Sequence, residues 1–134
     1  MSGGSLPVVT KAQVGGRTLL AFALVHWNLR RRPLPDAVGK LGARPRPPTD
    51  RIDPRRLSRI VHRTLRIGDR RPRCLINALV LYRLLREQGD PAELVIGLPH
   101  DARDKDAHAW VELDGVDVGP PPGRDGHEEL ARYA

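Results

Sequence analysis

The hydrophobic pattern of this 134-residue chain changes its period once, and that change limits the folds open to it. Before residue 90, apolar residues recur at spacings of three and four, which is typical of helices that bury one face. After Pro91, apolar and polar residues alternate with a period of two, which is typical of half-buried strands. The order predicts an α+β fold in which N-terminal helices precede a small antiparallel sheet.

A chain of this length has room for one hydrophobic core, because a second core would need about another hundred residues. The first fifteen residues are small and polar and lack sustained periodicity. We therefore expect residues 1–15 to be a flexible tail and residues 16–134 to be a single domain.

Four helices are predicted before residue 90. Pro33 stops the first of them, and Asp53 can cap the free amides of a helix that starts at Pro54. Gly89 suits the left-handed position at the end of the last helix. That helix has a predicted buried stripe of Leu75, Ala78, Leu79, Tyr82 and Leu85. The predicted helices are Gly16–Arg32, Leu34–Leu41, a helix from Pro54 to the break at Gly68–Pro72, and Arg73–Gln88.

Three strands are predicted after Pro91. Asp114 and Gly115 form a strong two-residue hairpin signal, and a two-residue turn there pairs Glu112 with Asp117. Consecutive prolines from Pro120 end the pairing. The predicted strands are Ala92–Leu98, Ala107–Leu113 and Val116–Val118.

The net charge of +7 conceals a polarity along the chain. Residues 1–73 hold 17 Lys and Arg against 4 Asp and Glu, whereas residues 74–134 hold 6 against 12. Such asymmetry is typical of a nucleic-acid or membrane arm. The basic half lacks interleaved aromatic residues and any nucleic-acid recognition motif, and a bias toward Arg codons with solvated helix faces explains its charge. We therefore expect no nucleic-acid partner.

The apolar run Leu19–Leu29 resembles a membrane segment only superficially. It is too short for about 30 Å of hydrocarbon, and three arginines follow it where a signal peptide would have small residues. A buried helix is the better interpretation, and no membrane span is expected.

Cys74 is the chain's single cysteine, so it excludes an intramolecular disulfide and a Cys-rich zinc site. This favours a reducing, cytoplasmic setting. The histidines other than His108 lack ligand-like spacing, and Asp101, Asp104 and Asp106 lack the Gly and Glu of a calcium loop. We therefore expect no metal and no cofactor.

Cys74 also stands where a nucleophile would be activated. A helix N-terminus stabilises a thiolate, and Arg71 and Arg73 add positive potential. His108 lies on a predicted strand between two alanines, with Trp110 on the same face. An imidazole so placed can take the thiol proton and return it to a leaving group. The alternative is a small core cysteine and a structural histidine.

Two motif blocks carry a resemblance to a known family. RCLINALVLYRLLR spans Arg73–Arg86, and AHAWVELDG spans Ala107–Gly115. Together, at this separation, they resemble the transglutaminase-like cysteine peptidases of lasso-peptide biosynthesis, which remove the leader from a ribosomally made precursor. The resemblance covers nearly all of the chain after the tail. It implies a papain/transglutaminase-like core in which Cys74 is the nucleophile and His108 the general base and acid.

The third catalytic position departs from the family pattern. The family usually places an acidic residue twelve positions past the histidine, where this chain has Pro120. Asp117 is the nearest replacement, but it lies about 13 Å along the sheet from His108, at about 3.3 Å per residue. A backbone carbonyl, or an acid of the loop carrying Asp101, Asp104 and Asp106, is a further alternative.

The resemblance implies a hydrolase for natural product biosynthesis that forms an acyl-enzyme and passes it to water. Transfer to an amine uses the same residues and stays open. The implied partners are the precursor peptide, a leader-binding protein and a ring-closing ligase. Trp110 and Asn77 are predicted to bind substrate, with a surface or capping role as the alternative for Asn77. The alternative function, motivated by Pro120, is a weak or inactive member that binds a peptide or partner protein.

Overall fold

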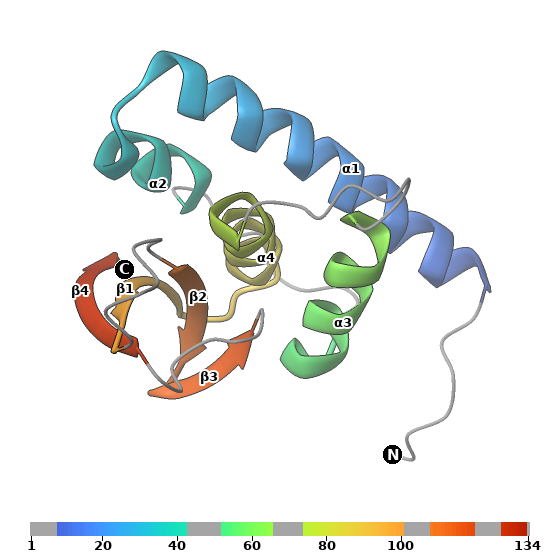
Figure 1. Ribbon diagram of the computed structural model, residues 1–134. Coiled ribbons are helices and arrows are strands. Elements are labelled where there is room, and N and C mark those ends of the chain that lie inside the picture. The colour runs from blue at the N-terminus through green and yellow to red at the C-terminus, as the bar shows by residue number, and fades with distance from the viewer. Residues whose placement is uncertain (1–7, 43–51, 66–73, 101–107, 120–126, 134) are drawn as a thin grey trace.

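The structure is a computed structural model that describes residues 8–42, 52–65, 74–100, 108–119 and 127–133 (Figure 1). Helices come first and strands follow, which confirms the predicted α+β class. The helices are α1 (Val8–Arg31), α2 (Leu34–Gly42), α3 (Pro54–Leu65) and α4 (Cys74–Glu87). The strands are β1 (Ala92–Pro99), β2 (His108–Leu113), β3 (Val116–Gly119) and β4 (His127–Tyr133).

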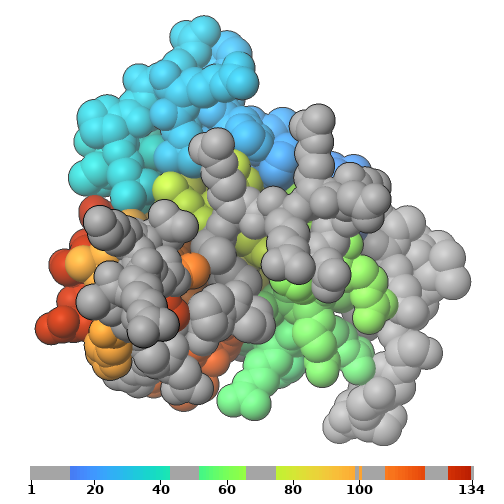
Figure 2. All heavy atoms as spheres, viewed as in Figure 1, coloured from blue at the N-terminus to red at the C-terminus, as the bar shows by residue number. Residues whose placement is uncertain are grey.

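Helix α4 is the centre of the fold. It lies between the other three helices and the sheet (Figure 1), and little of it is visible in the space-filling view of Figure 2. A single buried stripe was predicted, but no residue from Ile76 to Tyr82 is more than 9% exposed. The helix is buried on nearly every side because its sequence is almost continuously apolar there.

Helix α1 begins earlier than predicted. It starts at Val8, so the predicted helix start at Gly16 was wrong. Val14 belongs to the core, and the buried Thr18 hydroxyl donates to the Val14 carbonyl at 2.7 Å. Gly15 and Gly16 lower the helix propensity of this segment and hid its start from sequence reasoning.

The predicted signals at the start of α3 and after the end of α4 agree with the structure. The Asp53 carboxylate accepts a hydrogen bond from the Arg56 backbone N–H at 3.3 Å, which satisfies one free amide at the start of α3. Gly89, with φ of 93°, follows α4 in the left-handed conformation that residues with a Cβ adopt only with strain.

The four strands form one antiparallel sheet in the order β3-β2-β1-β4. The hairpin between β2 and β3 is as predicted: Asp114 and Gly115 have φ of 52° and 78°, and Glu112 pairs with Asp117. Strand β4 was not predicted, because its sequence HEELARY is rich in charge and offers no apolar alternation.

The sheet has two unlike faces. The register pairs Leu94 with Val111 and Ile96 with Ala109, and these four side chains belong to the core that includes α4. Strand side chains alternate between faces. The opposite face therefore carries the remaining β2 residues, His108, Trp110 and Glu112.

Candidate active site

Cys74 is the first residue of α4. The first amides of a 14-residue helix lack partners within the helix and carry the positive end of its dipole. This is the local setting predicted for an activated thiol. The Cys74 side chain, Arg71 and Arg73 lie outside the described residues.

The elements that begin at Cys74 and His108 are neighbours in the fold. Helix α4 is about 21 Å long at about 1.5 Å per residue, and β1 starts shortly after its last turn. Strand β2 is antiparallel to β1 and begins opposite Gly97 near the end of β1. Helix α4 packs against both strands, so the helix that starts at Cys74 contacts the strand that starts at His108.

His108 is half-buried and contacts another histidine. Its ring centroid lies 4.6 Å from that of His127 on β4, and the ring planes cross at 70°. His127 also lies 6.0 Å from the Trp110 ring. His108 thus belongs to a three-ring cluster made by β2 and β4.

Trp110 shares a sheet face with His108, as predicted, but it is only 1% exposed. Its indole Nε1–H donates to the Glu112 carboxylate at 2.9 Å. The other Glu112 oxygen accepts from Arg132 at 3.1 Å. In the structure Trp110 supports the site from within, and its contact with substrate stays a prediction.

Asn77 is 3% exposed, so the alternative of a surface role was wrong. Its side-chain amide donates to Nδ1 of His62 on α3 at 3.2 Å. An Nδ1 that accepts this bond leaves the ring proton of a neutral His62 on Nε2. Asn77 lies one turn past Cys74 and fixes α3 against that end of α4, and its binding of substrate stays a prediction.

Asp117 lies opposite Glu112, four strand positions from the partner level of His108, which corresponds to about 13 Å. Its Oδ1 accepts a hydrogen bond from the Gly119 backbone N–H at 2.8 Å. This bond stabilises the irregular end of β3, where the register with β2 shifts. Both observations favour a structural role for Asp117 over orientation of His108.

Pro120, which stands at the family's third position, lies outside the described residues, as do the alternative loop acids Asp101, Asp104 and Asp106. Within the described ranges, no three His, Cys, Asp or Glu side chains gather as a metal site would require. No helix in those ranges is long and apolar enough to cross a membrane.

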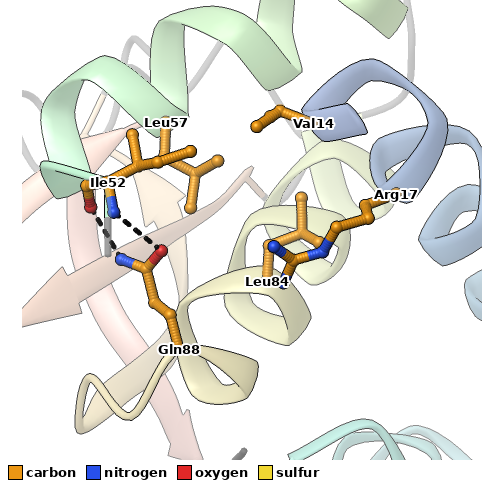
Figure 3. A pocket seen from close by; sticks show the side chains of 6 residues that line it. All are labelled: Val14, Arg17, Ile52, Leu57, Leu84 and Gln88. Atoms are coloured by element: carbon orange, nitrogen blue, oxygen red, sulfur yellow. Dashed lines mark hydrogen bonds between the residues drawn. The ribbon is translucent and has the colours of Figure 1, made fainter. Parts of the chain in front are cut away.

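A small pocket lies at the other end of α4 (Figure 3). It is lined by Val14, Arg17, Ile52, Leu57, Leu84 and Gln88. Its accessible space of about 10 Å³ admits about one water molecule. Gln88 closes it by exchanging two hydrogen bonds with the Ile52 backbone, at 3.3 and 2.7 Å. The pocket is a packing gap about 20 Å from Cys74, by the length of α4.

Sequence reasoning missed His62, His127 and Arg132. His127 and Arg132 lie on the unpredicted strand β4, so their positions had no basis in the sequence pattern. His62 is half-buried on α3, and its partner Asn77 lies on another helix, so no spacing within α3 could indicate the contact.

Comparison with known families gives one match that covers most of the chain. The match is to the family described as the Transglutaminase-like superfamily and extends over residues 17–132. Comparisons with curated proteins and with solved structures found no significant match. The matched range includes α4, β2 and all the site residues described above. The chain therefore belongs to the transglutaminase-like superfamily.

Proposed function

We propose that this protein is a cysteine peptidase that removes the leader from a ribosomally synthesised precursor peptide during lasso-peptide maturation. The observation that carries the proposal is the contact between α4, the helix that starts at Cys74, and β2, the strand that starts at His108. Membership of the superfamily supports a Cys–His reaction, and the two sequence blocks around these residues support the leader-peptidase specificity.

In the proposed reaction, His108 takes the proton of the Cys74 thiol, and the thiolate attacks the carbonyl carbon of the scissile amide. The C–N bond then breaks as His108 returns the proton to the leaving amine, which leaves a thioester on Cys74. His108 next takes a proton from water, whose oxygen attacks the thioester. The peptide leaves as a carboxylic acid, and the proton restores the thiol.

The position of His108 on the sheet limits how its imidazole and the Cys74 thiol can meet. His108 is on the sheet face opposite α4, but it is the first residue of β2. In the proposed arrangement, the thiol at the start of α4 reaches the imidazole around the end of the strand and not beneath the helix. The scissile bond would enter at this end of the interface, far from the pocket lined by Gln88.

The proposal extends to partners and setting. We infer a leader-binding protein that presents the precursor, a ligase that closes the ring afterwards, and a reducing, cytoplasmic environment for the lone thiol. The basic N-terminal half is a docking face of suitable charge for an acidic peptide or partner, so cleavage should weaken as salt screens that attraction.

The test is cleavage of a precursor peptide, in the presence of its leader-binding protein, followed by mass spectrometry. Cys74→Ala and His108→Gln should each abolish the leader fragment. His26→Gln is the matched control, because His26 is also half-buried but lies on α1. Cleavage by Cys74→Ala at the wild-type rate would refute the proposal.

The alternative of a silent peptide-binding member gives a different result in a second measurement. A thiol activated by the helix N-terminus should react with iodoacetamide well below the pH at which an ordinary cysteine ionises, which is about 8.5. Absence of cleavage together with labelling only above about pH 8 would favour the silent member.

A further inference from the structure

We propose that His127 is a positioning residue for His108. In this inference, which rests on the proposed function, the His127 ring packs edge-to-face on His108 and supplies the orientation that an acidic third residue gives elsewhere in the family. The juxtaposition comes from β4, the strand that the sequence pattern did not reveal.

The contact has the geometry of a specific aromatic pair. The centroids of His108 and His127 are 4.6 Å apart at an interplanar angle of 70°. Edge-to-face pairs prefer separations of about 4.5–7 Å and contribute energy beyond simple burial. Both side chains are half-buried, so one side of the pair is packed while the other remains accessible.

Gly97 leaves room for the third ring of the cluster, Trp110. Strand β1 lies between β2 and β4, and Gly97 is the β1 residue opposite His108. A Cβ at Gly97 would stand 2.7 Å from the Trp110 ring and 2.8 Å from the Glu128 carbonyl oxygen. The missing side chain therefore leaves the space that the Trp110 ring fills over β1, next to the backbone of β4.

The cluster is anchored on its inner side. Trp110 packs over Gly97 and lies 6.0 Å from His127. Its indole is held by Glu112, a buried carboxylate that also binds Arg132 of β4. Glu112 joins β2 to β4, and Trp110 packs between these two strands. This packing on the inner side of the cluster holds His127 beside His108.

A general base needs a fixed ring orientation. An imidazole turns about its terminal side-chain torsion, whose preferences are broad, and a ring turned away from the thiol presents carbon in place of nitrogen. A second ring packed edge-to-face, as in the observed contact, limits this freedom. Loss of that partner should lower kcat more than it alters KM, because the substrate contacts do not change.

The test compares His127→Ala with His127→Phe in the cleavage assay. His127→Ala should lower kcat by about 10- to 100-fold with KM within about twofold, whereas His127→Phe keeps a ring and should stay within about threefold of the wild type. His26→Ala is the control, because His26 makes a similar contact with Phe22, at 4.4 Å and 73°, on α1. A wild-type kcat for His127→Ala, or equal losses in the Ala and Phe variants, would overturn the inference.

A second measurement does not depend on turnover. The ring of His127 should shift the carbon-bound proton resonances of His108 in NMR spectra of the full chain. The shift should disappear in His127→Ala and persist in His127→Phe, while His26→Ala leaves it unchanged. Unmoved His108 resonances in His127→Ala would refute the contact even if the protein cleaves its precursor. A wild type that shows the shift but cleaves nothing would refute the proposed function and leave the contact established.

Discussion

The two faces of the sheet carry different kinds of side chain. The face toward α4 is aliphatic, with Leu94, Ile96, Ala109 and Val111 in the common core. The opposite face holds rings and charges tied by directional contacts, with Glu112 bound by both Trp110 and Arg132. The same two strands, β1 and β2, supply both faces, because alternate residues of each strand point to opposite sides.

The contacts that stabilise the fold therefore differ in kind from the contacts that orient the candidate site. Aliphatic contacts are non-directional and roughly proportional to buried area, so they hold α4 on the sheet without fixing any one atom. Hydrogen bonds and ring contacts contribute less net energy each but depend on orientation. His108 lies on the face where orientation is controlled.

The largest expected effect is on the aliphatic face. Leu94→Ala removes a fully buried side chain from the core and should lower the free energy of unfolding by about 2–5 kcal/mol. Urea denaturation followed by circular dichroism measures the change. Leu130→Ala, on an exposed position of β4, should cost less than about 0.5 kcal/mol. Equal costs at the two positions would contradict the assignment of the faces.

The next effect is on the polar face. Glu112→Gln keeps an acceptor for the Trp110 indole but removes the charge opposite Arg132, and it should cost about 1–3 kcal/mol by the same measurement. Glu93→Gln is the matched control. Its carboxylate meets the same Arg132 at 3.4 Å but is partly exposed, so its loss should cost less than about 1 kcal/mol. A cost for Glu93→Gln as large as that for Glu112→Gln would show that burial does not distinguish the two carboxylates.

The sequence predicted the aliphatic face better than the polar one. Leu94 and Val111 follow from alternation, and Cys74 and His108 follow from the two motifs that contain them. The contact of His108 with His127 did not follow, because β4 pairs with β1 and its register depends on backbone partners, not on an apolar pattern. The burial of Asn77 was not predicted for a similar reason: its partner His62 lies on another helix.

Helix α4, which packs on the aliphatic face, also buries the hydroxyl of Tyr82. It is buried and has no hydrogen-bond partner among the described residues. It lies where a Cβ on Gly42 at the end of α2 would collide with the ring. An unpaired buried hydroxyl is unfavourable, so Tyr82→Phe should leave the stability at pH 7 unchanged or raise it by up to about 1 kcal/mol.

The same substitution should have a larger relative effect in alkali. Burial raises the pKa of Tyr82 above its usual 10.0, an effect that the nearby Arg86 partly opposes. Below pH 10 the phenol keeps its proton in both the folded and the unfolded chain. Above pH 10 the unfolded chain loses the proton first, so the folded state loses stability as the pH rises.

Unfolding measured at pH 7 and pH 10.5 should show this loss in the wild type and less of it in Tyr82→Phe. Tyr133→Phe, on a half-buried residue of β4, is the matched substitution. An equal change with pH in Tyr82→Phe and the wild type would mean that burial of the Tyr82 hydroxyl does not raise its pKa.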